Sequence, residues 1–190
     1  MPLEILFESL HAFDTNASAW AEGLRWEPLT AVFVFASLWW VKWPLLLALG
    51  ACGDCSCRKR WPRAAAAGAL AVGAAALLIT VLKDFFDRAR PPLADASIDP
   101  VGIVPASASF PSGHAATAFA AAVAVGLVHP RLRRPLLAMA AVVALSRVYL
   151  GVHYVFDVVA GTLIGIAIGY AAARTVQAVG QAPTRLALRL

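Results

Sequence analysis

The sequence predicts an all-α membrane protein: a polytopic bundle of about five transmembrane helices, preceded by an amphipathic helix at the membrane surface. Two observations predict this fold class. Hydrophobic residues make up 61% of the 190 residues and charged residues only 14%, whereas soluble domains contain about 45–50% apolar and about 25% charged residues. Apolar runs long enough to span a bilayer, about 20 residues in a helix, recur between short polar loops. We expect a single domain over residues 1–190.

Residues 1–27 are predicted to lie at the membrane surface. Residues 3–13 fit a short amphipathic helix whose apolar side would enter the interface. Its polar side carries Glu4, Glu8 and His11. We interpret His11 as a solvated interfacial side chain. Residues 14–27 are polar and carry two tryptophans suited to the headgroup region, Trp20 and Trp26. With acidic residues in its apolar part and no basic residues before it, the start is unlike a secretory signal peptide.

The first crossing is predicted at residues 28–50, and it is irregular. Its middle contains Trp39, Trp40, Lys42, Trp43 and Pro44. Either Lys42 extends toward the interface from one kinked helix, or the crossing ends near Trp43 and a short re-entrant piece follows. We favour the single kinked crossing.

Four further crossings are predicted, at residues 62–86, 112–128, 133–149 and 153–174. The second crossing is rich in alanine and glycine, which suits close packing of helices. Residues 91–110, rich in proline, aspartate and serine, form the loop that follows it. The bundle then covers residues 28–174, and residues 175–190 form a basic cytoplasmic tail.

The polar loop at residues 51–63 contains the three cysteines, Cys52, Cys55 and Cys57. Structural zinc usually takes four cysteine or histidine ligands, and no histidine is near. A fourth ligand would have to be Asp54 or come from a second subunit. We favour reduced thiols without a metal, because the predicted topology places this loop in the cytoplasm.

The charges predict the orientation of the bundle. With an external N-terminus and five crossings, one side receives Arg58, Lys59, Arg60, Arg63, Arg131, Arg133, Arg134 and Arg174. By the positive-inside rule that side is the cytoplasm. Ten of the eleven acidic residues, all except Asp54, then lie on the other side. The net charge of +5 is therefore a topology signal and does not indicate a nucleic-acid partner.

The stretch Ser146–Asp157 places a cation, an imidazole and a carboxylate in an otherwise apolar run. His153 and Asp157 are four residues apart, so on a helix they would share one face. The carboxylate could hold one ring nitrogen and leave the other free and more basic, as a nucleophilic histidine requires. A break near Gly151 would let Arg147 fold back toward the imidazole and grip an anion. The spacing alone fits a histidine at a helix start equally well.

A second cluster, Pro111–His114, is a tight turn that opens a small-residue helix. The backbone N–H groups of Ser112 and Gly113 would point at an anion where the helix dipole is positive. Ser112 could instead be a simple helix cap, and His114 a packed helix histidine.

Lys83 and Arg90 form the third cluster, at the end of the second crossing. With Arg147 they place three cations at one membrane depth, which favours a multiply charged anion such as a phosphoryl group. Each could otherwise extend from a helix end toward the interface. Ionisable groups in membrane segments are functional candidates by default.

Taken in order, Lys83-x6-Arg90-Pro91, Pro111-Ser112-Gly113-His114 and Ser146-Arg147-x5-His153-x3-Asp157 resemble the three signatures of the type 2 phosphatidic acid phosphatase (PAP2) superfamily. The resemblance implies that His153 is a nucleophile that forms a phosphohistidine and that Asp157 orients it. It implies that His114 is the general acid and later the base. It also implies that the phosphoryl oxygens are held by Lys83, Arg90, Ser112, Gly113 and Arg147. No metal or other cofactor is expected, because the cations take that role.

Two features depart from this pattern. Arg88 lies close to Arg90, which leaves the register of the first signature open. Many members have six crossings, whereas five are counted here together with an interfacial helix. Of the remaining acidic residues near the lysine, Asp84 could be a ligand, and Asp87 is expected to pair with Arg88 or to face water.

The resemblance implies a membrane lipid phosphate or pyrophosphate as substrate and the bilayer as surroundings. The short chain is similar to bacterial undecaprenyl pyrophosphate phosphatases, which implies the bacterial inner membrane. The topology predicted from the charges places all three signatures, and with them the site, on the extracytoplasmic face. Phosphatidylglycerol phosphate, phosphatidic acid and lipid A are alternative substrates. Two other classes stay open: a non-enzymatic protein that binds anionic lipid, and a vanadate-dependent haloperoxidase, against which the apolar spans argue. The sequence leaves the oligomeric state open.

Overall fold

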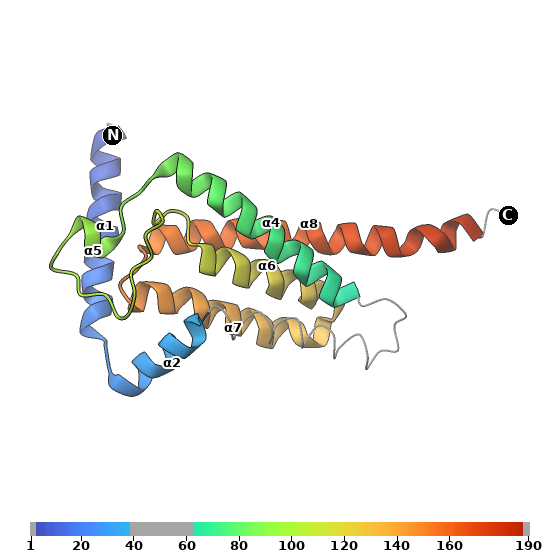
Figure 1. Ribbon diagram of the computed structural model, residues 1–190, viewed down its shortest axis with the longest axis horizontal. Coiled ribbons are helices and arrows are strands. Elements are labelled where there is room, and N and C mark those ends of the chain that lie inside the picture. Colours follow the sequence, from blue (N-terminus) through green and yellow to red (C-terminus); the bar gives the residue numbers. More distant parts are fainter. Residues whose placement is uncertain (1–2, 39–62, 188–190) are drawn as a thin grey trace.

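The computed structural model describes residues 3–38 and 63–187, and every regular element in these ranges is a helix (Figure 1). The helices are α1 (Leu3–Gly23), α2 (Glu27–Ser37), α4 (Arg63–Phe86), α5 (Pro91–Ala94), α6 (Gly113–Val128), α7 (Pro130–Tyr149) and α8 (Val155–Ala187). The predicted all-α class is therefore confirmed for the described part of the chain.

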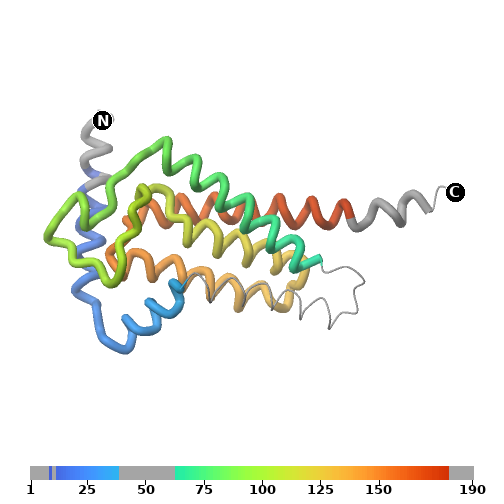
Figure 2. Tube along the Cα trace, viewed as in Figure 1, coloured from blue at the N-terminus to red at the C-terminus, as the bar shows by residue number. Residues whose placement is uncertain are grey.

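Four long helices run alongside one another and form the bundle. The central helix is α6, which contacts α4, α7 and α8. Helix α1 runs across the end of the bundle where α6 and α8 begin, and α2 turns back along α7 (Figure 1, Figure 2). The loop after α4 covers the same end. Three segments far apart in the sequence thus meet there: α1, this loop and the turn between α7 and α8.

The core of the bundle is built from small side chains. Ten of the sixteen residues of α6 are buried, and most of them are alanines. Helix α8 faces α6 with a glycine on each of three successive turns, Gly161, Gly165 and Gly169. A Cβ atom on Gly169 would lie 2.5 Å from the carbonyl oxygen of Ala120, so the backbones touch directly. Small residues four apart permit this close approach between membrane helices.

The predicted crossings at 62–86, 112–128 and 133–149 correspond to α4, α6 and α7 within three residues at either end. The segments Arg63–Ala94 and Val155–Val179 are long and apolar enough to cross a membrane, so the predicted number of five crossings is not confirmed. Of the predicted first crossing, only the part before residue 39 is described, as α2. Lys42 and the three cysteines lie outside the described residues.

Two predicted helix ends differ from the structure. Helix α8 continues to Ala187, so residues 175–187 are helical, and their place in a cytoplasmic tail stays a prediction. Its 33 residues correspond to about 50 Å at 1.5 Å per residue, more than the roughly 30 Å of a hydrocarbon core. Helix α1 ends at Gly23 and not near residue 13, because the polar residues after 13 continue the helix and face the end of the bundle.

Candidate active site

The turn between α7 and α8 is set by a glycine. Helix α7 ends in a left-handed residue, Gly151, with φ of +71°. The Gly151 N–H donates to the Val148 carbonyl at 2.9 Å and the Val152 N–H to the Arg147 carbonyl at 3.2 Å, the pair of bonds that closes a Schellman motif. The break predicted near Gly151 is confirmed. His153 follows in this turn, two residues before α8 begins, and not on the helix itself.

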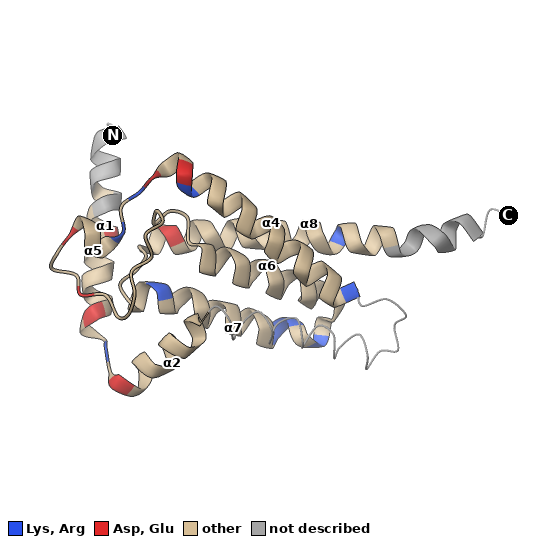
Figure 3. Cartoon of the chain, viewed as in Figure 1, with Lys and Arg blue, Asp and Glu red and all other residues tan. Residues whose placement is uncertain are grey.

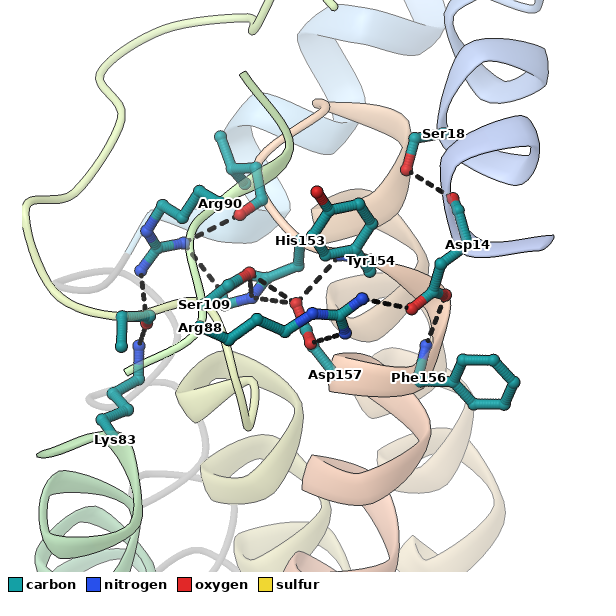
Figure 4. Close-up of polar contacts among 12 residues, drawn as sticks. Asp14, Ser18, Lys83, Arg88, Arg90, Ser109, His153, Tyr154, Phe156 and Asp157 are labelled. Atoms are coloured by element: carbon teal, nitrogen blue, oxygen red, sulfur yellow. Dashed lines mark hydrogen bonds and ion pairs between the residues drawn. The ribbon is translucent and has the colours of Figure 1, made fainter. Parts of the chain in front are cut away.

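His153 and Asp157 nevertheless pair as predicted. Nδ1 of His153 lies 3.4 Å from Oδ2 of Asp157, and both side chains are buried (Figure 4). The same oxygen accepts hydrogen bonds from the Ser109 hydroxyl at 2.5 Å and the Tyr154 N–H at 3.0 Å. A carboxylate with these donors stays ionised and accepts from Nδ1–H, so the lone pair of the imidazole is on Nε2.

The side chain against Nε2 is Arg90 and not the predicted Arg147. Nη1 of Arg90 lies 3.2 Å from Nε2 of His153, and it also donates to the Val152 carbonyl at 2.8 Å. Nε of Arg90 donates to the Ser107 carbonyl at 2.8 Å. Arg147 is buried, and its Nε has no hydrogen-bond partner within the described part of the chain.

The surroundings keep His153 uncharged. Burial lowers the pKa of His153 to about 4, and the charges of Arg90 and Arg147 lower it further against the opposing effect of Asp157. At neutral pH the ring is therefore neutral, with a lone pair available for attack.

A cavity of about 290 Å³ brings the three sequence clusters together. Five of the eight predicted site residues line it: Lys83, Arg90, Gly113, His114 and His153. The rest of the wall comes from α4, α6 and the loop, namely Ala76, Ile79, Thr80, Asp84, Pro105, Ser107 and Thr117. Asp157 lies behind His153, and Arg147 does not line the cavity. Two histidines and two cationic residues from distant segments therefore line one space.

Ser112 only partly matches its predicted role. Its N–H donates to the Asp157 carbonyl at 2.9 Å, so this amide does not point at an anion in the cavity, because the N-terminal turns of α6 and α8 are bonded to each other. Its hydroxyl is buried and has no hydrogen-bond partner among the described residues. Gly113 does line the cavity, where the next amide at the helix start is located.

The loop before α6 positions the cations. Nζ of Lys83 donates to the Ser107 hydroxyl at 3.2 Å and to the Ala108 carbonyl. Nη2 of Arg90 donates to the same two oxygens, at 3.2 Å and 3.3 Å. The loop thus fixes both cations at the cavity wall through the same two oxygens.

Three residues that bind Asp157 directly or through Arg88 were not among the predicted site residues: Asp14, Arg88 and Ser109. Arg88 pairs with Asp157 at 2.7 Å and with Asp14 at 2.8 Å. Of the two alternatives predicted for Asp87, pairing with Arg88 or exposure to water, the structure shows the second, since Asp87 is exposed and Arg88 binds the other two carboxylates. Ser109 lies three residues before the Ser112-Gly113-His114 turn, and its nearness to that turn was a usable signal. Asp14 is 143 residues away from Asp157 in the sequence, and no sequence pattern links the two residues.

Comparison with known proteins decides the family: the PAP2 superfamily matches residues 64–181, more than half of the chain. The chain belongs to the PAP2 superfamily. Decaprenylphosphoryl-5-phosphoribose phosphatase of Mycobacterium tuberculosis (strain H37Rv) is 37% identical over 135 residues, which cover 68% of each chain. Lipid A 1-phosphatase of Rhizobium etli is 39% identical over 93 residues, 47% of this chain and 40% of that protein.

Among solved structures, the chain resembles the transmembrane PAP2-type phosphatidylglycerolphosphate phosphatase of Bacillus subtilis, with a TM-score of 0.75 and 26% identity. The match covers 90% of this chain and 88% of that one. The predicted class of enzyme, a PAP2-type phosphatase, is confirmed by these relatives. They also support a location in a membrane.

Proposed function

We propose that this PAP2 phosphatase hydrolyses a lipid phosphate or pyrophosphate through a phosphohistidine on His153, without a metal ion. The observation that carries the proposal is the cavity itself. Its wall holds a neutral imidazole whose Nδ1 is paired with Asp157, a second imidazole on His114, and the cations Lys83 and Arg90. Binding alone would not require a buried histidine–carboxylate pair.

The first step forms a bond from Nε2 of His153 to phosphorus and breaks the bond from phosphorus to the lipid oxygen. Asp157 stabilises the charge that develops on the ring, and His114 gives a proton to the leaving oxygen. In the second step His114 takes a proton from water, the water oxygen bonds to phosphorus, and the phosphorus–nitrogen bond breaks. Phosphate leaves, and both histidines return to their starting states.

The cations stabilise the charge of the phosphoryl oxygens in both steps. Lys83 and Arg90 already face the cavity, and the unpartnered hydroxyl of Ser112 and the N–H of Gly113 stand at the start of α6. Arg147 does not line the cavity, but its buried positive charge adds to the attraction for the phosphoryl group. We infer that phosphate binding replaces the 3.2 Å contact between Arg90 and Nε2, because a phosphoryl oxygen is the better partner for the guanidinium.

Among lipid phosphates we propose a polyprenyl substrate of the undecaprenyl pyrophosphate type. The name of the mycobacterial relative, which acts on a decaprenyl-linked phosphate, supports a polyprenyl chain. The names of other relatives keep lipid A and phosphatidylglycerophosphate as alternatives. We further propose that the enzyme lies in the bacterial inner membrane with its cavity facing the extracytoplasmic side.

The decisive experiment measures phosphate release by purified protein, with EDTA present, from undecaprenyl pyrophosphate, phosphatidylglycerol phosphate, phosphatidic acid and lipid A. We expect release from at least one of them, fastest from the polyprenyl substrate. His153→Ala should lower turnover by several orders of magnitude, as loss of a nucleophile does. His114→Ala should lower it by about 10²–10⁴-fold, the usual contribution of a general acid–base.

The matched control is His129→Gln, a histidine between α6 and α7 at the opposite end of the bundle. Because His129 is buried, the melting temperature of this variant is measured as well, and turnover per folded molecule should stay within about threefold, since the change lies far from the cavity. Near-normal turnover of His153→Ala would exclude His153 as the nucleophile. A wild-type protein that binds these lipids but never releases phosphate would favour the non-enzymatic alternative.

A further inference from the structure

The interfacial helix α1 carries a buried carboxylate, Asp14, whose side chain is 1% exposed. Both of its oxygens are occupied. Oδ1 accepts the Phe156 N–H at 3.1 Å, and Oδ2 accepts a hydrogen bond from Nη2 of Arg88 at 2.8 Å. Phe156 is the second residue of α8, where backbone N–H groups lack partners within the helix. A side chain of one helix thus caps another helix that begins 141 residues later in the chain.

Arg88 joins this carboxylate to the catalytic pair. Its Nη2 binds Asp14, and its Nη1 donates to Oδ1 of Asp157 at 2.7 Å. The guanidinium also lies 4.0 Å above the ring of Tyr154, which limits its movement. Figure 4 shows the result as a continuous row of side chains from Asp14 through Arg88 and Asp157 to His153.

The row determines which oxygen of Asp157 the imidazole meets. Arg88 occupies Oδ1, so Oδ2 is left for Nδ1 of His153, and the carboxylate cannot rotate without losing a charge-assisted bond. Asp14 has an electrostatic role as well. An Arg88 with no second counter-ion would bond to Asp157 alone and withdraw negative charge from the imidazole, whereas Asp14 shares the guanidinium.

We propose that Asp14 and Arg88 are positioning residues that act on His153 through Asp157, so that helix α1 completes the active site. The proposal rests on the proposed function, since it assumes that His153 is the nucleophile. A purely structural role for the same contacts would be to dock α1 on the bundle, as the contact of Phe13 with Phe156 does, with ring centroids 5.8 Å apart. The two roles predict different kinetics.

The test compares Asp14→Asn and Arg88→Lys in the wild-type protein and in an Asp157→Asn background. The asparagine can still accept the Phe156 N–H, and the lysine retains a positive charge, so both changes are conservative. Glu22→Gln is the matched control, because Glu22 is also an ion-paired acid of α1 but binds only Arg25, at 3.3 Å. For each variant, kcat and KM are measured on the lipid that the wild-type enzyme hydrolyses fastest, together with the melting temperature in detergent.

In the wild-type background we expect each change to lower kcat by about tenfold or more, the lower end of what loss of an orienting contact costs, with KM within about twofold. In the Asp157→Asn background, where residual turnover is followed in long incubations, the same changes should lower kcat by less than about twofold, because groups that act as one unit are not additive. Glu22→Gln should change neither parameter.

Equal losses in both backgrounds, or a rise in KM at constant kcat, would overturn the positioning role. If Asp14→Asn lowers the melting temperature so far that it cannot be assayed, Arg88→Lys decides alone, since Arg88 is partly exposed and less critical for folding. A failure of the wild-type enzyme to release phosphate would instead overturn the proposed function, so the two failures are distinct.

Discussion

The two halves of the bundle are held together in different ways. In the half that carries the cavity, segments distant in sequence are joined by ion pairs and charge-assisted hydrogen bonds, such as those from Arg88 to Asp14 and Asp157. In the opposite half, α6 and α8 touch through glycine and alanine, with Gly169 against Ala120. Close contact between small residues thus provides a packed frame, and the buried charges Asp14, Arg90 and Asp157 are placed at its end with partners for each.

The halves also differ in the sign of their charge. Figure 3 shows the acidic residues gathered at the cavity end, where several basic residues also lie, whereas the charged residues that it colours at the far end of α4, α7 and α8 are basic. The far-end cations among the described residues are Arg63, Arg131, Arg133, Arg134 and Arg174. This distribution supports a cytoplasmic far end by the positive-inside rule.

The largest expected difference between the halves is therefore their accessibility to reagents that cannot cross the membrane. A cysteine introduced as Asp99→Cys, in the exposed loop over the cavity, should react with a membrane-impermeant thiol reagent on intact cells. The natural Cys52, Cys55 and Cys57 should react only after the cells are permeabilised. The reverse pattern of labelling would invert the proposed orientation.

A smaller difference concerns packing in the half without the cavity. Gly169→Ala should destabilise the protein by about 2 kcal/mol, within the usual cost of overpacking, because the new Cβ would lie 2.5 Å from the Ala120 carbonyl oxygen and 2.9 Å from the Val123 Cβ. The measurement is thermal unfolding in detergent, and kcat of the folded protein should be preserved.

The matched control is Gly73→Ala in α4, where no atom lies within 4 Å of the added Cβ. Here alanine should be neutral or stabilising by up to about 1 kcal/mol, because glycine is the weaker helix former. Equal effects of the two substitutions would show that helix propensity, and not contact with α6, decides the stability of α8.

The smallest expected effect is the pH dependence of stability at the cavity end. The pKa of His153 is about 4 in the folded protein, against 6.5 for an ordinary histidine, so the unfolded chain binds the extra proton between these values. Stability therefore rises with pH through this window, is complete above pH 6.5, and is lost as the pH falls toward 4. Between pH 6 and 5 the loss should be on the order of 1 kcal/mol.

Because other groups titrate in the same range, the wild-type protein is compared with His153→Gln, which has no proton to gain at this position. Thermal unfolding at pH 6 and pH 5 should show a smaller loss of stability in the variant. If both proteins lose the same amount, His153 is not buried in its neutral form.

Much of the candidate site could be predicted because its residues lie in short stretches with recognisable spacing. His153 and Asp157 are one helical turn apart, and the Ser112-Gly113-His114 turn opens α6, so each cluster indicated its own geometry. Which cation meets the imidazole could not be predicted. That depends on the path of the loop after α4, which brings Arg90, and not Arg147, to Nε2.

The contacts made by α1 were beyond sequence reasoning for a related reason. Asp14 looks like one polar residue among several on an interfacial segment, and only the docked helix shows that it is buried. No close contact was predicted for the glycines at 161, 165 and 169, although a spacing of four between small residues is typical of close helix contacts in membranes. The ends of α1 and α8 lie beyond the predicted ones, because polar residues continue each helix past its apolar part.

The contact between Arg90 and Nε2 of His153 links binding to chemistry in the proposed mechanism. An N–H of the guanidinium faces the lone pair that would attack phosphorus, and this N–H has to turn away before a bond can form. A dianionic headgroup attracts a guanidinium more strongly than a neutral imidazole does. We therefore expect the phosphate group itself to uncover the nucleophile, so that ligands without such a charge leave the histidine protected.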